Sequence, residues 1–120
     1  MQRVMRFELQ VDNPQAAIDF YADVFGWKFH QLEGHDYWFV STGESGEGID
    51  GAIMKSPDGV ARTVNSIAVP SVDQFLAKIE ERGGQVVVPK MTMPGMGYLA
   101  YCIDPEGTIF GVSQTDPEAK

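Results

Sequence analysis

The sequence predicts an α+β fold made of two tandem units, each a strand, a helix and three further strands, with the helices outside a curved mixed sheet. Three observations predict this fold. The chain opens with a strand that runs into a capped helix, the same order of elements restarts near the middle, and neither half could bury its sheet face alone.

The first strand and helix have clear sequence signals. Residues 7–11 alternate apolar and polar side chains, which is typical of a strand with one face on a core. Asn13 is a good N-cap, and Pro14 suits the first helical position because its missing N–H is not needed there. Apolar residues then recur at helical spacing until Gly26, where we expect the helix to end.

The remaining elements follow from alternation and turn signals. Strands are expected over residues 28–32, 37–41, 49–55, 64–69, 85–88, 98–103 and 108–114, with a helix starting at Ser71 and a Met-, Pro- and Gly-rich loop over 91–97. A turn signal at 56–59 divides module one, about 3–56, from module two, about 62–115. The polar tail, 116–120, is expected to be frayed.

The second half repeats the first at an offset of about 58 positions. At this offset apolar positions fall on apolar positions, and Gly26 falls on Gly84 at the end of the second helix. The coincidence of element order and helix ends indicates an internal duplication.

Length and composition limit the class of protein. A chain of 120 residues fits a single domain, and a net charge of −8 argues against binding to nucleic acid or acidic membranes. The lone Cys102 excludes an internal disulfide and is expected to be a small buried residue. With no signal peptide and no apolar run near the length of a membrane helix, we expect a cytoplasmic protein.

Two motifs carry a family resemblance. The first half reads Val-Asp-Asn-Pro…Ile-Asp-Phe-Tyr…Phe-Gly-Trp, and the second ends Asp-Pro-Glu-Gly-Thr-Ile-Phe-Gly. Over roughly residues 3–115 the chain resembles the vicinal oxygen chelate superfamily, which includes glyoxalase I, bleomycin-resistance proteins and extradiol dioxygenases, and looks closest to the glyoxalase-like branch. The resemblance implies two βαβββ modules whose sheets curl around a shared cavity, commonly in a dimer.

In the enzymes of that family a divalent metal lies in the cavity, held by His or Gln on the first strand and Glu on the last strand of each module. The matching positions here are Arg6 or, in another register, Glu8, then Ser66 on the fifth strand and Gly111 on the last. Residues 51–53 on the fourth strand offer no donor side chain. Only Glu8 could be a ligand, so no metal cofactor is expected. His30 and His35 flank a predicted turn and do not change this expectation.

The groove is expected to join polar groups of the first strand to aromatic and Met side chains. The candidate ligand-binding residues are Arg6, Glu8, Gln10, Trp38, Ser66, Met93, Met96, Tyr98 and Tyr101. Tyr37 and Phe39 are alternatives to Trp38, one of the two second-module tyrosines should face the groove, and the Met residues suit a lid or a dimer contact. The alternatives are ordinary core for the aromatics, and a solvated edge or an ion pair for Arg6 and Glu8.

The sequence therefore predicts a metal-free, homodimeric protein of the glyoxalase and bleomycin-resistance fold that binds a small organic molecule in the cavity between the modules. Its acidic balance favours a neutral or cationic ligand. The alternative is a glyoxalase-like lyase or isomerase with an atypical or absent metal site, for which Glu8 is the only candidate base. A third possibility is an accessory module without a ligand.

Overall fold

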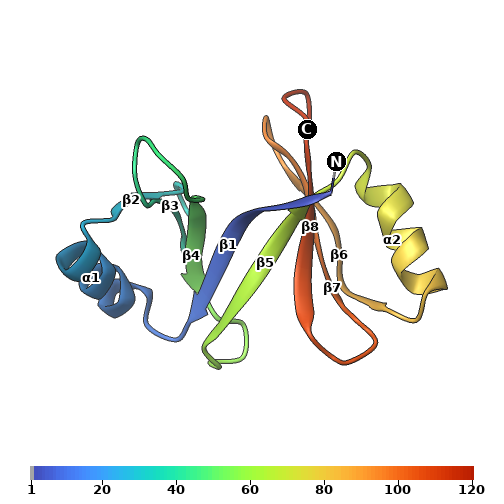
Figure 1. The fold of residues 1–120 in the computed structure, drawn as a ribbon, viewed down its shortest axis with the longest axis horizontal. Helices are drawn as coiled ribbons and strands as arrows, with labels where there is room; N and C mark the ends of the chain where they lie inside the picture. The colour runs from blue at the N-terminus through green and yellow to red at the C-terminus, as the bar shows by residue number, and fades with distance from the viewer. Residues whose placement is uncertain (1) are drawn as a thin grey trace. The chain divides into compact units, whose positions relative to one another are not determined.

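The computed structural model describes residues 2–120, which form eight strands and two helices (Figure 1). The chain divides into two compact units. The first unit is residues 6–64, and the second consists of the described residues outside that range, 2–5 and 65–120. Among residues 2–120, no helix has the length and apolar character needed to cross a membrane.

The first unit contains most of β1 and the next four elements. They are β1 (Arg3–Val11), α1 (Pro14–Phe25), β2 (Lys28–Gln31), β3 (Tyr37–Ser41) and β4 (Gly51–Lys55). The strand order is β2-β3-β4-β1, with β1 parallel to β4 and the other neighbours antiparallel. This unit is a βαβββ module, as predicted.

Local signals set both ends of α1 where the sequence predicted them. The Asn13 side chain accepts a hydrogen bond from the Ala16 N–H at 3.2 Å, and Pro14 takes the first helical position. At the other end Gly26 has φ 74°, a left-handed conformation that is cheap for glycine, and its N–H donates to the Ala22 carbonyl at 2.9 Å.

The core of the first unit lies between α1 and its sheet. Ile18 from the helix meets Val40 and Ile53 from the strands, and Ile53 is completely buried. Partly buried side chains surround this cluster, namely Phe7, Leu9, Val11, Ala17, Trp27, Phe29 and Trp38. The apolar face of each strand is therefore the face that meets α1.

The second unit repeats the plan. Its elements are most of β5 (Arg62–Ala68), α2 (Val72–Glu81), β6 (Gln85–Met93), β7 (Gly97–Ile103) and β8 (Ile109–Thr115). The strand order is β5-β8-β7-β6, with β5 parallel to β8 and antiparallel pairing elsewhere. The prediction of an α+β fold with two βαβββ modules is confirmed; the cavity between the modules stays a prediction.

The second core is equivalent to the first. Ser71 caps α2 by accepting from the Gln74 N–H at 3.2 Å, and Val72 is completely buried. The buried cluster contains Val69, Val72, Ala100 and Val112, with Ile67, Phe75, Leu76, Ile79, Tyr98 and Phe110 packed against it. Cys102 is fully buried, as predicted.

The end of α2 differs in detail from the predicted repeat. The glycine with positive φ is Gly83, at 94°, and Gly84 does not have this conformation. Gly84 is instead a point of close approach, because a Cβ there would lie 2.6 Å from Ile79 Cγ2 and 3.0 Å from the Ile103 carbonyl oxygen.

Strand β6 corrects the predicted loop over residues 91–97. The strand continues to Met93, and Met91 and Met93 pair with Leu99 and Gly97 of β7. The register shifts on either side of Val88 accommodate Pro89, and β6 is the last strand in the order, where a residue without an N–H is tolerated. Only residues 94–96 connect the two strands.

The polar tail is hydrogen-bonded to that connection. The Gly95 N–H donates to the Ala119 carbonyl at 2.8 Å, and the Asp116 N–H donates to the Met96 carbonyl at 2.8 Å. Ala119 is only 4% exposed. The structure thus differs from the expectation of a frayed tail, because backbone pairing supplies order that composition does not reveal.

Candidate functional site

The candidate site is the face of the first-unit sheet that points away from α1. Alternation along β1 puts Leu9 on the core side and Arg6, Glu8 and Gln10 on the opposite side. Across the ladder Glu8 pairs with Ala52, which pairs with Phe39, and Gln10 pairs with Met54, which pairs with Tyr37. We call Arg6, Glu8, Gln10, Tyr37 and Phe39 the polar face.

Glu8 and Gln10 form a buried polar pair at its centre. Their exposed fractions are 5% and 3%, and the Gln10 Nε2 donates to Glu8 Oε1 at 3.1 Å. The Gln10 Oε1 accepts from Arg62 Nη1 at 2.9 Å. Because Arg62 can only donate, the Gln10 amide oxygen must face it and the amide nitrogen must face Glu8.

An outer network fixes Arg62 in turn. Arg62 Nη2 forms an ion pair with Asp58 Oδ2 at 2.6 Å, and the Val60 N–H donates to Asp58 Oδ1 at 3.1 Å. The hydrogen bond from Arg62, followed by those from the Ser56 hydroxyl and the Val60 N–H, holds the pKa of Asp58 well below its usual range. A continuous chain of polar contacts therefore runs from exposed Asp58 through Arg62 and Gln10 to buried Glu8.

Arg6 lies at the other end of the polar face, beside the aromatic side chains. Its Nη2 donates to the Gly51 carbonyl at 2.9 Å, and its guanidinium carbon is 5.9 Å from the centre of the Phe39 ring. Tyr37 and Phe39 pack edge to face with ring centres 5.4 Å apart. The guanidinium is thus oriented by a fixed carbonyl and an aromatic ring.

The phenol of Tyr37 is strongly affected by this environment. Burial, and next the negative charge of Glu8, raises the pKa of Tyr37 to about 12, although the charge of Arg6 and its hydrogen bond act in the opposite direction. The phenol therefore stays protonated and can donate a hydrogen bond on the polar face.

A cavity of about 260 Å³ opens beside Arg6. Its lining residues are Arg6, Lys28, Phe29, His30, Phe39, Val40, Ser41 and Asp50. We call it the Arg6 pocket; it lies entirely within the first unit. It combines apolar walls with a few converging polar groups, the usual makeup of a small-molecule site.

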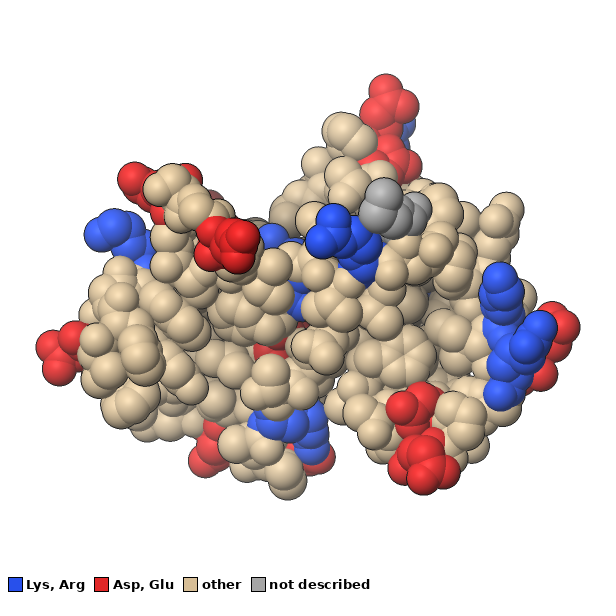
Figure 2. Space-filling model, viewed as in Figure 1, with Lys and Arg blue, Asp and Glu red and all other residues tan. Residues whose placement is uncertain are grey.

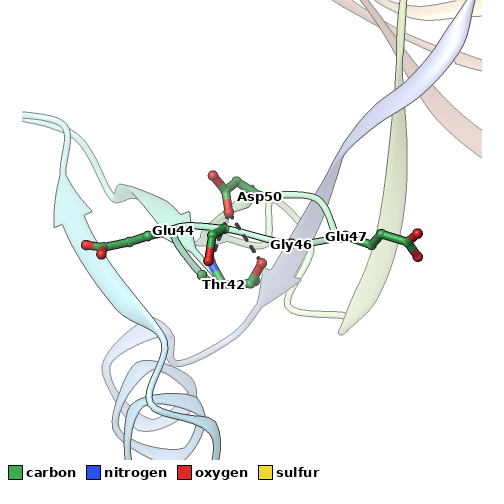
Figure 3. Close-up of a pocket in the computed structure, with 8 residues that line it drawn as sticks. Thr42, Glu44, Gly46, Glu47 and Asp50 are labelled. Atoms are coloured by element: carbon green, nitrogen blue, oxygen red, sulfur yellow. Dashed lines mark hydrogen bonds between the residues drawn. The ribbon is translucent and has the colours of Figure 1, made fainter.

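A second cavity, of about 170 Å³, lies inside the loop that joins β3 to β4 (Figure 3). Asp50 Oδ1 accepts from the Thr42 N–H at 2.9 Å, and the Thr42 hydroxyl donates to the Ile49 carbonyl at 2.8 Å. The side chains of Glu44 and Glu47 extend away from the loop in opposite directions. This cavity is a product of the loop's own hydrogen bonding rather than a convergence of functional groups.

The structure separates the candidate aromatic residues by face. Trp38 lies in the α1-side core, whereas its neighbours Tyr37 and Phe39 lie on the polar face. In the second unit Tyr98 packs against the core cluster, with Lys90 Nζ 4.8 Å from the centre of its ring. Tyr101 lies on the opposite face of β7, away from the helix, and its place in a ligand groove stays a prediction.

The remaining predicted site residues belong to the second unit. Ser66 pairs with Gly111, which pairs with Tyr101, so these three positions share the sheet face opposite α2. Ser66 Oγ lies 3.4 Å from Ser113 Oγ. Met93 ends β6, and Met96, 41% exposed, lies in the connection to β7. A ligand-binding role for these residues stays a prediction.

Sequence reasoning missed Arg62, Lys28 and His30 as members of this region. The spacing of Asp58 and Arg62, four residues apart around a turn, is a usable signal for an ion pair. Lys28 and His30 alternate with core-facing Phe29, which places both on the polar side of β2. Their proximity to Arg6 depends on strand pairing, which a single sequence does not reveal.

The donor set does not fit a resident divalent metal of the kind that the family resemblance implies. Within residues 2–120, no group of three or more His, Cys, Asp and Glu side chains is placed to hold a metal ion. Of the positions that the family resemblance implies as metal ligands, only Glu8 carries a carboxylate. Ala52 lies opposite it on β4, and the implied positions on β5 and β8 are Ser66 and Gly111. Arg6 adds a positive charge nearby.

Comparison with known proteins identifies the family. Residues 3–112 match the model of the glyoxalase/bleomycin resistance protein/dioxygenase superfamily. Proteins named "Putative glyoxylase CFP32" in Mycobacterium bovis and Mycobacterium tuberculosis are 31% identical over 115 residues, which cover 92% of this chain and 43% of theirs. The chain therefore spans less than half the length of these curated relatives.

Solved structures agree on the fold. The hypothetical protein BH1468 from Bacillus halodurans superposes with a TM-score of 0.71 at 14% identity, over 99% of this chain and 98% of its own. The Mn(II)-bound glyoxalase from Novosphingobium aromaticivorans superposes with a TM-score of 0.65 at 22% identity, over 99% of this chain and 41% of its own. These structures show the fold, and the family match over residues 3–112 shows that this chain belongs to the glyoxalase/bleomycin resistance protein/dioxygenase superfamily.

Proposed function

We propose that the chain binds a small organic molecule on the polar face of its first unit and does so without a resident metal. The observation that carries this proposal is the buried Glu8–Gln10 pair, 5% and 3% exposed, on a sheet face that the helix-side core does not use. Burying a carboxylate and an amide is costly unless both are hydrogen-bonded, and here Gln10 donates to Glu8 and accepts from Arg62.

The surroundings of the pair suit recognition of a compact organic ligand. Phe39 and Tyr37 supply aromatic surface, Tyr37 supplies a protonated phenol, and Arg6 supplies an oriented guanidinium. The adjoining Arg6 pocket, about 260 Å³, adds volume next to these groups. Membership of a family that includes small-molecule-binding proteins and enzymes supports the same proposal.

The homodimer and the cytoplasmic location stay predictions. Sedimentation equilibrium would test whether the protein is a homodimer.

The test is a thermal-shift screen that begins with the metal content of the freshly purified protein. We expect no stoichiometric metal, and no rise in melting temperature with Ni²⁺, Zn²⁺, Mn²⁺ or Fe²⁺. A panel of small aromatic compounds should contain some that raise it, because a ligand of the native state stabilises that state. The rise should disappear in Arg6→Gln and shrink in Tyr37→Phe.

Arg82→Gln is the matched control, because it removes one exposed positive charge at the end of α2 and leaves the polar face intact. Its response should equal that of the unmodified chain. Stoichiometric metal that chelator removes, with a thermal shift lost in Glu8→Gln, would show that the metal-free part of the proposal is wrong. A panel without any binder would overturn the binding part.

A second candidate is a glyoxalase-like lyase or isomerase reaction that uses Glu8 as a base. It is favoured by the burial of Glu8 beside the protonated phenol of Tyr37, which places a carboxylate that can accept a proton and a phenol that can donate a hydrogen bond on one face. The similarity to proteins named as glyoxylases supports it. Conversion of the methylglyoxal–glutathione hemithioacetal that is lost in Glu8→Gln, but kept in Arg82→Gln, would favour this candidate.

A further inference from the structure

The Arg6 pocket concentrates basic groups in an acidic protein. Arg6, Lys28 and His30 all line it, although the chain has only 9 Lys and Arg residues and a net charge of −8. On the face shown in Figure 2, acidic and basic side chains are interspersed and form no broad surface of one sign. The single acidic lining residue, Asp50, already accepts a hydrogen bond from the Thr42 N–H.

Strand pairing brings these groups to one place. His30 of β2 pairs with Phe39 of β3, and Lys28 is two residues from His30 on the same face of the same strand. Arg6 reaches this row from β1, because its guanidinium carbon lies 5.9 Å from the centre of the Phe39 ring. Two strands that are not neighbours in the sheet thus supply positive charge around one aromatic side chain.

Arg6 is held in a fixed orientation before any ligand arrives. Its Nη2 donates to the Gly51 carbonyl at 2.9 Å, and a further hydrogen bond joins it to the phenol of Tyr37. A guanidinium has five N–H donors in a planar fork that matches a carboxylate or a phosphate, and an oriented fork loses less entropy on binding.

The other lining residues set the shape of the ligand. Phe39 provides the aromatic surface, because the side chains of Phe29 and Val40 point to the core on the other face of the sheet, and the Phe39 ring offers a flat platform beside the guanidinium. A volume of about 260 Å³ lies at the small end of known ligand pockets, so it suits a single ring and not an extended cofactor-like molecule.

We propose that the Arg6 pocket binds the anionic group of a small planar organic molecule, with Arg6 contacting a carboxylate or phosphate and Phe39 contacting the ring. This inference rests on the proposed small-molecule binding and names its ligand class. The net charge of the chain predicts a neutral or cationic ligand, and this inference reverses that preference for the Arg6 pocket. The charges that line the pocket lie closer to the ligand than the other charges of the chain, so they have the stronger effect on it.

The experiment compares four probes of one shape by amide chemical shifts in two-dimensional NMR: benzoate, phenyl phosphate, benzamide and benzylamine. Benzoate or phenyl phosphate should bind about tenfold tighter than benzamide, and benzylamine should bind most weakly. The perturbed amides should fall on β2 and β3. Comparison of the first two probes separates a carboxylate ligand from a phosphate ligand.

Two variants test the residues named. Arg6→Gln should reduce the preference for the anion to less than about twofold, whereas Arg82→Gln should leave it unchanged. Phe39→Leu should weaken all four probes by a similar factor, because it removes the ring contact and no charge. Far-ultraviolet circular dichroism and a thermal melt establish that each variant is folded. If Arg6→Gln does not fold, Arg6→Lys replaces it, because lysine keeps the positive charge but lacks the planar fork of N–H donors.

The outcomes separate this inference from the proposed function. Equal binding of benzamide and benzoate to β2 and β3 would leave small-molecule binding in place and show that the anion preference is wrong. An anion preference that survives in Arg6→Gln would also overturn the inference. If none of the four probes perturbs these strands at millimolar concentration, the inference is wrong, and the broader compound screen decides the proposed function.

Discussion

Gln10 donates a side-chain hydrogen bond to Glu8 over 3.1 Å while both side chains are almost completely buried. The two residues are separated by one position on β1, so alternation alone puts them on the same face of the sheet. Their contact is directional because Arg62 occupies the amide oxygen of Gln10. The first prediction concerns the energetic importance of this contact.

Replacing Gln10 by Leu should destabilise the protein by about 1–3 kcal/mol, because it removes a donor to buried Glu8 and the acceptor for Arg62. The measurement is the free energy of unfolding from urea denaturation. The matched control is Gln15→Leu, which deletes an exposed 2.8 Å hydrogen bond from Gln15 to Asp19 and should change the free energy by less than about 0.5 kcal/mol. Equal effects of the two substitutions would contradict the prediction.

The ion pair between Asp58 and Arg62 should make stability depend on pH in acid. The native state holds the pKa of Asp58 well below the ordinary value of 3.8, so the unfolded chain binds a proton first as the pH falls. The contribution of Asp58 is therefore present above that value and is lost progressively as the pH falls below it. Urea midpoints measured from pH 7 down to acid should fall less steeply for Asp58→Asn than for the unmodified chain.

Arg62→Gln should flatten the same acid dependence, because the hydrogen bond from Arg62 is the largest cause of the lowered pKa of Asp58. The flattening should be partial, because the hydrogen bonds from Ser56 and Val60 remain, and the double variant should behave like Asp58→Asn, in which the titrating carboxylate is absent. Further flattening of the Asp58→Asn profile by Arg62→Gln would show that Arg62 acts on another group that titrates in acid.

Gly51 should be intolerant of any side chain. Its built Cβ would collide with the carbonyl oxygen of Phe7 and lie 2.7 Å from ring atoms of the same residue. Gly51→Ala should therefore cost about 1–3 kcal/mol of unfolding free energy and disturb the carbonyl that orients Arg6. Gly43→Ala is the matched control, because its Cβ would meet only the Ser45 carbonyl oxygen at 4.0 Å. A neutral Gly51→Ala would disprove the close approach of β1 and β4 at this point.

Local sequence signals predicted both ends of α1. The features that the sequence did not predict depend on strand pairing between residues that are distant along the chain. Asn13 and Gly26 act through hydrogen bonds within a few residues, which a sequence displays directly. The extension of β6 to Met93 depends on pairing with Gly97 across a turn and on the tolerance of an edge strand for Pro89. Composition alone made the same residues look like a loop.

In the candidate site, too, alternation along a strand predicted some residues, and contacts between distant residues determine the others. Alternation correctly placed Arg6, Glu8 and Gln10 on the face away from α1. It left Trp38 and its two neighbours as alternatives, and only the pairing of Trp38 with core residue Ile53 decides between them. Arg62 was missed because its contact with Gln10 spans 52 positions.

The last prediction concerns the phenol of Tyr37. Burial and the charge of Glu8 raise its pKa to about 12 in the native state, above the ordinary value of 10.0. Since the unfolded chain loses this proton first, the contribution to stability is complete below pH 10.0 and is lost as the pH rises through about 12. An ultraviolet absorbance titration should show a phenol that ionises late, and Tyr37→Phe should remove it.

Tyr98→Phe is the control for this titration, because Tyr98 packs in the second-unit core rather than on the polar face. It should leave the late-ionising phenol in place. The titration also tests the arrangement of the polar face: Glu8→Gln removes the negative charge that raises the pKa of Tyr37 and should move the late ionisation to lower pH. An unchanged titration in that variant would show that Glu8 and Tyr37 do not share one electrostatic environment, and the polar face would then not act as a single site.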